Sequence, residues 1–560
     1  MNGGKRRADL AVTVAAAVLI AGSYVSFQHL SVKSAPTWDE MHMWGMGYYL
    51  LKTGRFDLPG LGWHPPLTSY LNSLPLLSRD IPIEAFRTSH SDRFYLDVDR
   101  GNQIFPILGL DVFRRSRTPF VLIACLTGAA VFAWSRSLWG PAGGLLSLCL
   151  YLLCPTLMAN EFLMTTDGLM SLLLFVALAA LIRSLESPTT ASLAFFVIAT
   201  ALAPGAKITG LLIGPLAALA VAVRLVLPGP FSILVPRRGL RAVGRIGFLA
   251  YWAIAGAIAV AAIWLSLAIL YQGDVALRTF RFAATRVSGY VAEHGSPVFL
   301  DGHVSSRGFR EYYGKALLYK TPIATLAAWL LAMLVPAGVP RWRALAMWIP
   351  SAIVLVYFSF SGYTISLRFA LVSLLWLHAA AGRLAAPGRF AGARRVAAGL
   401  LVAATLGDVA GSYPYPRAFV DRAFVRGPGY TAIADADLDW GEGLLAVRDY
   451  AAAHKLGPIA LSYHGSIDPE ALGIQLAWYE NPLDRKRSHG TPPDHGLIFV
   501  SGTNLAGLYY PGGKRHEFED RYCWLKTEKP VEVVGGAIYV FDLDAVPAER
   551  RWRPWVCRHQ

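Results

Sequence analysis

The chain has 560 residues, of which 54% are hydrophobic and only 16% are charged, and its formal net charge is +15. Soluble domains carry about 25% charged residues, so this composition indicates a protein that lipid surrounds. The excess of Lys and Arg does not indicate that the protein binds nucleic acid, because these residues are not gathered in one domain. They lie between apolar stretches, where the basic loops of a multi-pass membrane protein set its orientation.

Apolar stretches recur along most of the chain, and a helix needs ~20 such residues to cross a bilayer. They are predicted at 9–28, 118–135, 141–160, 168–183, 190–204, 207–227, 246–271, 316–336, 344–361, 367–384 and 396–412. The fold class that follows is a polytopic α-helical membrane protein with about eleven transmembrane helices. No small-residue cleavage site is evident near the first stretch, so we expect an uncleaved anchor.

Basic residues alternate between the two sides of the predicted helices. Arg136, Arg183, the group around Arg237 and the group around Arg389 fall in loops of one side, which predicts a cytoplasmic N-terminus. With an odd number of helices, the C-terminal region then lies outside. The external side has two long loops, 29–117 and 272–315. Since long ordered loops tend to carry sites, we expect function on this side.

The last part of the chain differs from the rest in composition. Residues 1–412 are predicted to form the transmembrane domain, and residues 413–560 a separate external soluble domain. Strand-like runs at 459–463, 497–501 and 537–543, with a helix predicted at 442–454, indicate a small α/β fold. Cys523 and Cys557 lie in this domain and could pair outside the cell, which the sequence alone leaves open.

The doublet Asp39-Glu40 comes soon after the first apolar stretch. One interpretation is chemical: Asp39 is a general base, and Glu40 orients it or binds a cation. The other is structural, with both acids solvated at the start of a helix near Met41, where negative charge is favourable. From these residues alone both interpretations stay open.

Two further polar residues have similar alternatives. His64 precedes Pro65-Pro66, which holds it in one direction, so it could bind a metal, contact a phosphate or cap a helix that starts near Leu67. A lone His is more often structural, because a metal needs several ligands. Asp167 follows a short external turn and suits a helix N-cap, a role compatible with a place in the same site as Asp39.

Basic residues are expected near the same external face. Lys207 enters an apolar helix after Pro204-Gly205, where it either snorkels to the surface or serves a function. Lys320 and Arg368 lie on this face by the predicted topology, together with Arg310 and Lys315. Such cations could neutralise a phosphate and stabilise it as a leaving group.

In their order along the chain, these residues resemble the membrane glycosyltransferases of GT-C fold that use polyprenyl-phosphate-linked sugars. This superfamily includes the protein O-mannosyltransferases and the aminoarabinose transferases that act on lipid A. The matching motifs are Asp39-Glu40, HPPL at 64–67, Leu138-Trp139-Gly140, TTDGLM at 165–170, AKITGLL at 206–212, Lys320-Thr321-Pro322, DADLDWGEGL at 435–444, Tyr463-His464-Gly465 and Cys523-Trp524-Leu525.

The resemblance implies an inverting single displacement from a polyprenyl-phosphate sugar to a lipid, glycan or protein acceptor. The enzyme would lie in a bacterial cytoplasmic membrane, among membrane lipids, and act on its periplasmic side. Asp39 would be the base or acceptor-binding acid, supported by Glu40 and Asp167. Substrate would be bound by four residues: His64, Lys207, Lys320 and Arg368. Some relatives bind a divalent metal near the HPPL position, but no complete ligand set is evident, so a metal stays open.

Two motifs depart from the family pattern. Arg368 is followed by Phe-Ala-Leu-Val without the usual proline, and Glu442 stands where the family usually has Gln. A rival class is a transporter or flippase of lipid-linked sugars, which predicts internal repeats that this sequence lacks. A third is an assembly subunit, for which the acid pair would be dispensable.

Overall fold

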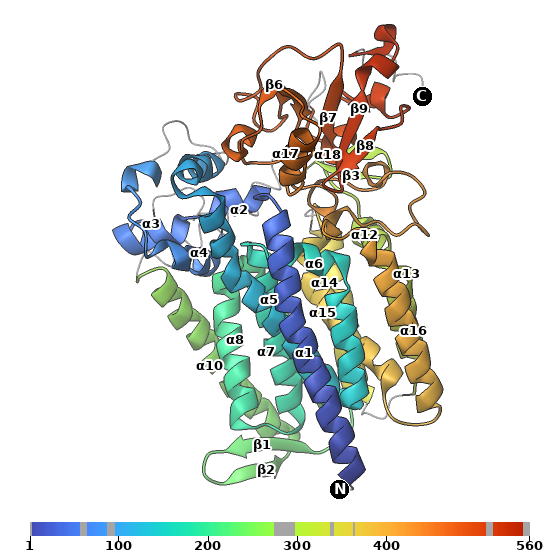
Figure 1. Cartoon of the computed structure of the whole chain (residues 1–560). Helices are drawn as coiled ribbons and strands as arrows, with labels where there is room; N and C mark the ends of the chain where they lie inside the picture. Colours follow the sequence, from blue (N-terminus) through green and yellow to red (C-terminus); the bar gives the residue numbers. More distant parts are fainter. Residues whose placement is uncertain are drawn as a thin grey trace.

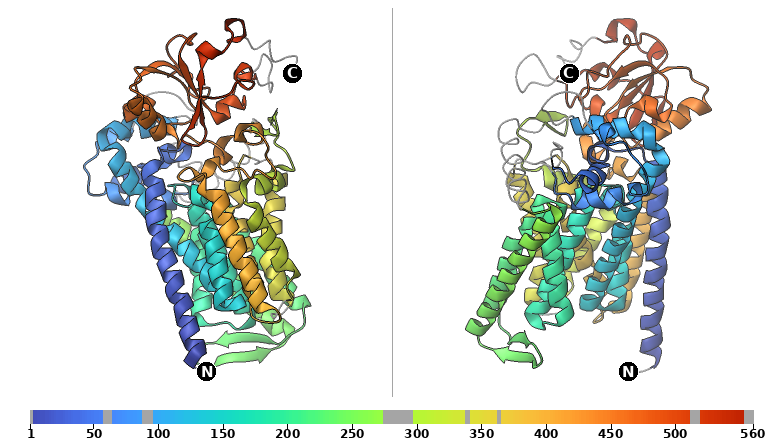
Figure 2. Two further views of the ribbon diagram at one scale, coloured as in Figure 1. Left: turned by 45° about the vertical axis from the view of Figure 1, so that its right-hand side comes forward. Right: turned by 90° about the vertical axis from the view of Figure 1, so that its left-hand side faces the viewer.

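The computed structural model describes residues 3–56, 64–86, 96–273, 297–336, 341–361, 365–510 and 519–552. Long helices form a bundle, and a smaller domain with a β-sheet covers one end of it (Figure 1). The N-terminus lies at the opposite end, and two further views show the same separation (Figure 2).

Every apolar stretch predicted from the sequence contains helix. The bundle helices are α1 (Gly3–Lys33), α5 (Leu96–Leu152), α7 (Thr166–Glu186), α8 (Thr190–Ala206), α9 (Ile213–Val226), α10 (Arg245–Leu270), α12 (Tyr312–Lys320), α13 (Ile323–Leu334), α14 (Arg341–Phe360), α15 (Leu371–Ala381) and α16 (Ala391–Ala410). Within the described residues, 6 helices are long and apolar enough to cross a membrane, or 7 if the bent pair α12 and α13 is one span. The chain is therefore a multi-pass membrane protein.

The expected count of about eleven spans is not confirmed. The α8 helix has only 17 residues, and α12 meets α13 at an angle of 111°. Thr321-Pro322 lies at that break, and Pro322 directly precedes α13. An apolar stretch can form a helix that is too short, or too bent, to cross the bilayer by itself.

The α5 element is broken at Gly109 and at Gly140, and the runs on the two sides of Gly140 are antiparallel. Its Gly140 has φ 80 and ψ −180, which is not helical. The Tyr151 hydroxyl donates to the Ala124 carbonyl at 2.7 Å. A straight helix would place residues 27 positions apart at a separation of ~40 Å. The chain therefore reverses at Gly140, as the separate predictions of 118–135 and 141–160 require.

The two predicted external loops contain regular structure. Within 29–117 lie α2 (Trp38–Met43), α3 (Met46–Thr53) and α4 (Leu67–Ser73), and α5 already begins at Leu96. Within 272–315, residues 274–296 lie outside the described residues, and the rest includes β3 (Val298–Leu300) and β4 (His303–Ser305). The short hairpin that β3 and β4 form pairs with the C-terminal region through Leu300 and Ile433.

At the N-terminal end of the bundle, β1 (Phe231–Val235) and β2 (Gly239–Val243) form an antiparallel hairpin. The sequence predicts only a basic loop here, whereas the structure has a hairpin. The Phe231 ring packs on the Phe248 ring at 4.8 Å, and Arg224 lies 4.7 Å from the Phe231 ring centre. These contacts with α9 and α10 hold the hairpin against the bundle.

The C-terminal region contains the predicted α/β elements. Helix α17 spans Leu444–Ala453, and a five-stranded sheet has the order β6-β5-β7-β9-β8. Its strands are β5 (Ile459–Ser462), β6 (Leu476–Glu480), β7 (Leu497–Ser501), β8 (Glu532–Val534) and β9 (Ile538–Asp542). Strand β5 is parallel to β6 and β7, whereas β9 is antiparallel to β7 and β8. The domain boundary at 412 and its external side stay predictions.

Cysteine use differs between the two regions. Cys125, Cys149 and Cys154 are free and lie in or beside bundle helices. Cys523 takes part in a disulfide, whereas Cys557 lies outside the described residues.

Glu40 and Arg117 form an ion pair with no exposed side-chain surface, which joins α2 to α5. The Arg117 Nε and Nη2 atoms donate to the two Glu40 oxygens at 2.7 and 2.5 Å. The same carboxylate accepts the Thr37 N–H and hydroxyl at 3.0 and 2.9 Å and the Met164 N–H at 3.1 Å. Arg117 also donates to the carbonyls of Ser31, Ser34 and Ala35. One pair thus connects the end of α1, the start of α2, α5 and the turn before α7.

We predict that Glu40→Gln or Arg117→Met will destabilise the protein by about 3–5 kcal/mol, because either change leaves one buried charge uncompensated. Thermal unfolding of the detergent-purified protein will show the loss as a lower midpoint. Arg115→Gln, an exposed position on the same helix, is the matched control and should change the midpoint little. An unchanged midpoint for Arg117→Met would contradict this role.

Candidate active site

The first residue of the site is Asp39 in α2. Thr37 is the N-cap of this helix, and Glu40 completes a capping box by bonding back to Thr37. This arrangement orients the Glu40 carboxylate toward Arg117. Asp39 instead forms an ion pair with Arg368, whose Nη1 lies 2.6 Å from the Asp39 Oδ2.

Four charged side chains converge in a row. Arg368 lies in η5 (Leu367–Ala370) and also contacts the Asp167 carboxylate at 3.4 Å. Asp167 sits in the first turn of α7 and pairs with Lys207, which links α8 to η4 (Ile208–Leu212). These side chains are only 2–18% exposed. Two acids and two bases from distant segments therefore alternate at one place, and their formal charges sum to zero.

Aromatic rings flank both cations. The Arg368 guanidinium lies 4.1 Å from the Trp440 ring centre and 5.1 Å from that of Phe369. The Lys207 ammonium lies 4.1 Å from the Phe369 ring centre. Such cation–π contacts stabilise charge that burial has removed from water.

His64 and His42 lie on the α2 side of this row, with ring centres 5.5 Å apart in an edge-on contact. Burial, with further repulsion from His42, lowers the pKa of His64 to about 4, so its imidazole is neutral near pH 7. Burial would raise the pKa of Asp39, but Arg368 and the two histidines outweigh it and hold that pKa below its ordinary value. The Asp39 side chain is therefore an ionised carboxylate in this arrangement.

The other predicted basic residues lie elsewhere. Lys320 is buried and donates to the carbonyls of Arg417, at 2.5 Å, and Phe419. Lys315 forms a half-exposed pair with Asp301, and Arg310 lies 5.6 Å from the Phe360 ring centre. The structure thus brings Asp39, Asp167, Lys207 and Arg368 together, with His64 beside them, whereas Glu40 and Lys320 hold backbone segments nearby.

The C-terminal segment contributes residues to which the sequence analysis gave no role. Asp437 lies in the DADLDWGEGL motif and accepts the Ser366 hydroxyl at 2.8 Å, the Leu367 N–H at 2.9 Å and the Tyr312 hydroxyl at 2.8 Å. Because these donors directly precede Arg368 or pack beside it, Asp437 fixes where η5 begins. The run of acids in this motif could have indicated a functional role, but the partners of Asp437 are visible only in the fold.

Glu442, which departs from the family pattern, has a defined partner. Its carboxylate lies 3.1 Å from the Arg417 Nε and accepts the Trp440 N–H at 2.9 Å. The Glu442 carbonyl accepts the Ala35 N–H at 2.9 Å, and the Trp440 carbonyl accepts the Trp38 N–H at 3.3 Å. The C-terminal segment is thereby bonded directly to the residues before α2 and to the first residue of that helix.

An aromatic stack continues from Trp38, the neighbour of Asp39. The His464 ring stacks on Trp38 at 6.0 Å and 11°, and on Tyr509 at 5.5 Å and 6°. Asp435 accepts the Tyr509 hydroxyl and lies 3.4 Å from the His464 Nε2. Asp435 adopts φ 54, a left-handed conformation that its fixed side-chain contacts over-determine.

No group of three or more His, Cys, Asp or Glu that could hold a metal ion occurs within the described ranges.

We predict that the His464–Asp435 pair stabilises the protein in a pH-dependent way. Burial would lower the pKa of His464, but Asp435 outweighs it and raises that pKa, while the pKa of Asp435 is lowered mainly by His464 despite burial. The stabilisation is complete below the ordinary His pKa of ~6.5 and is lost as pH rises through the folded value. At low pH, the stabilisation is fully present above the ordinary Asp pKa of ~3.9 and is lost as pH falls through the lowered pKa of Asp435.

The melting midpoint of the native protein should therefore exceed that of His464→Gln most strongly near pH 6, with the excess shrinking toward pH 9. A charged hydrogen bond of this kind contributes about 1.5–3 kcal/mol. His489→Gln, at an exposed position of the same domain, is the control. An excess that stays constant across this range would overturn the assignment of a protonated His464.

Comparison with known proteins finds no matching family model and no matching curated protein. Among solved structures, the chain is similar to ArnT from Cupriavidus metallidurans bound to undecaprenyl phosphate, with a TM-score of 0.47 and 12% identity over 94% of this chain and 97% of that one. The arabinofuranosyltransferase AftD from Mycobacteria gives a TM-score of 0.37 and 15% identity over 86% of this chain and 35% of that one.

Proposed function

We propose that this protein is a membrane glycosyltransferase that transfers a hexosyl or pentosyl group from a polyprenyl-phosphate donor to an acceptor. The observation that carries the proposal is the row Asp39–Arg368–Asp167–Lys207, which places a candidate base beside two cations at one end of a membrane bundle. The reaction is an inverting single displacement, and the donor lipid lies among the bundle helices.

Arg368 and Lys207 would hold the donor phosphate. In the protein as described, each cation is paired with a carboxylate. A phosphate that enters between them offers oxygens for charge-assisted hydrogen bonds and competes with these carboxylates. As the bond between the sugar and the phosphate breaks, both cations stabilise the negative charge that develops on the leaving oxygen.

Asp39 would be the general base. Its pKa is low because Arg368 opposes the effect of burial. If Arg368 turns to the phosphate, this opposition weakens and burial makes Asp39 a stronger base. Asp39 then accepts the proton of the acceptor hydroxyl while that oxygen attacks the anomeric carbon from the face opposite the phosphate, which inverts the configuration.

The remaining predicted residues have supporting roles in this proposal. Asp167 keeps Lys207 in place, and Glu40 orients α2 through Thr37 and Arg117. His64 is neutral and can hydrogen-bond to substrate without adding charge. Lys320 holds the 417–419 backbone that borders the site.

The site lies at the end of the bundle that carries the C-terminal domain (Figure 1). By the charge of the alternate loops we assign this end to the periplasmic side of a bacterial cytoplasmic membrane. The acceptor, a lipid, a glycan or a protein, would approach between the α2 region and the C-terminal domain.

We predict that Asp39→Asn will lower turnover by about 10²–10⁴-fold, because a positioned general base contributes that much. The assay uses proteoliposomes with a panel of polyprenyl-phosphate sugars and measures release of the lipid phosphate. Asp111→Asn, whose side chain is 87% exposed, is the matched control and should keep native turnover.

Near-normal turnover by Asp39→Asn would contradict the assignment of the base. If the native protein releases no lipid phosphate from any donor but moves one of them across the bilayer, it is a flippase instead. Equal expression and membrane insertion of the two variants separate a chemical effect from a folding defect.

A further inference from the structure

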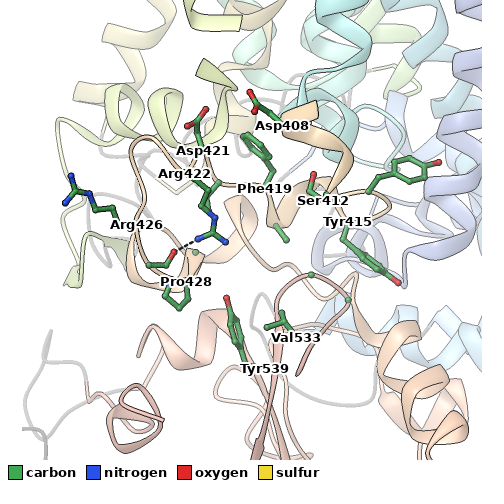
Figure 3. A pocket seen from close by; sticks show the side chains of 18 of the residues that line it. Asp408, Ser412, Tyr415, Phe419, Asp421, Arg422, Arg426, Pro428, Val533 and Tyr539 are labelled. Carbon is green, nitrogen blue, oxygen red and sulfur yellow. Dashed lines mark hydrogen bonds between the residues drawn. The ribbon is translucent and has the colours of Figure 1, made fainter. Parts of the chain in front are cut away.

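A cavity of about 980 Å³ lies between the bundle and the C-terminal sheet, apart from the four-charge row. Its walls come from the segment 411–429, the first residue of α13 and the residues around the β8–β9 turn. Figure 3 shows Arg422, Asp421 and Phe419 on the connecting segment and Tyr539 on the sheet. The proposed transfer reaction uses none of these side chains.

The cavity has a firm frame. Asp421 accepts the Ile323 N–H at 2.6 Å and the Ala423 N–H at 2.8 Å, which fixes the segment to the start of α13. On the sheet side, Gly536 has φ 81, and a Cβ there would lie 2.8 Å from the Cβ atoms of Ala418 and Tyr415. The turn therefore requires glycine to approach this closely, so the gap is a built feature of the fold.

The rim of the cavity is partly apolar and lies beside the ends of α13 and α16. Ile323, at the start of α13, is 48% exposed, and Tyr413, just beyond α16, is 40% exposed. Val533 on the sheet side is 42% exposed, and all three line the cavity. Apolar and Tyr side chains at helix ends are typical of the interface between acyl chains and headgroups.

The cavity offers exposed cations to an anion. Asp421 is buried and already satisfied by two N–H groups, which leaves Asp408 as the exposed acid. Two exposed guanidinium groups, those of Arg422 and Arg426, line the same space. Arg422 is held by a 2.8 Å bond to the Gly427 carbonyl, as Figure 3 shows. Guanidinium groups match phosphate oxygens in geometry and charge.

We propose that this cavity binds the phosphate headgroup of an anionic membrane lipid, with Arg422 and Arg426 at the phosphate and the apolar rim at the first acyl carbons. The site goes beyond the transfer reaction: it is a second lipid site, and its lining includes none of the four charged residues of the proposed donor site. Arginine binds phosphate groups through charge-assisted, often bidentate hydrogen bonds.

The test uses delipidated protein in detergent and phosphatidylglycerol with a fluorescent acyl chain, measured by fluorescence polarisation. We expect saturable binding that Arg422→Gln/Arg426→Gln weakens by roughly tenfold or more, since two charge-assisted bonds are lost. Val533→Glu, an exposed change that puts a negative charge at the rim, should weaken it as well. Arg448→Gln/Arg550→Gln, which removes two arginines of the same domain outside the cavity, should leave it unchanged.

Competition separates the possible ligands. Unlabelled phosphatidylglycerol should displace the probe, whereas phosphatidylcholine and inorganic phosphate at the same concentration should not. Equal displacement by phosphatidylcholine, or native affinity in the Arg422→Gln/Arg426→Gln variant, would overturn the proposal. Equal displacement by inorganic phosphate would show a simple anion site and would overturn the lipid assignment. None of these outcomes depends on turnover of a sugar donor.

Discussion

The buried pair between Glu40 and Arg117 is the constraint from which the rest of the candidate site follows. Ionised groups of this kind are costly to remove from water unless every oxygen and N–H finds a partner, and here the partners come from four separate segments. Because Glu40 is also the third residue of α2, its fixed position sets the rotation of that helix. The adjacent Asp39 is then directed toward Arg368. The doublet thus contains two acids with different tasks: one fixes the helix, and the other faces the charged row.

The C-terminal domain is part of the candidate site as well as a cover for it. Asp437 fixes the start of η5, Trp440 lies against the Arg368 guanidinium, and His464 stacks on the Trp38 ring. All three connect to the membrane region through hydrogen bonds or ring contacts, so displacement of the domain would alter the position of Arg368. This dependence gives a physical reason for Asp437 of the DADLDWGEGL motif, whose carboxylate contacts the bundle, whereas Asp435 and Glu442 are paired inside the C-terminal region.

The sequence predicted those features that depend on local pattern. Apolar stretches gave the helices, strand-like runs gave β5, β7 and β9 almost to the residue, and the order of motifs led to Asp39, Asp167, Lys207 and Arg368. It could not give features that depend on distant partners. Nothing local distinguishes Glu40 from Asp39, because Arg117 lies 77 positions away. Lys320 likewise has the composition of a phosphate ligand, but the carbonyls it binds come from residues nearly 100 positions later. The number of crossings stays unconfirmed, because apolarity alone does not show the bend of 111° between α12 and α13 or the short length of α8.

The balance of charge in the row also bears on the proposed mechanism. Two acids and two bases with little exposure form a neutral cluster, which keeps the burial cost low. A phosphodiester donor adds one negative charge, and the departing phosphate monoester gains a further one as its bond to the sugar breaks. If Asp39 accepts the acceptor's proton in the same step, it loses the negative charge that the phosphate gains. The buried site then keeps a constant total charge through the transfer, so the surrounding dipoles need little reorganisation. The ion pair between Asp39 and Arg368 places the proposed base next to the proposed phosphate ligand, where this exchange of charge can occur.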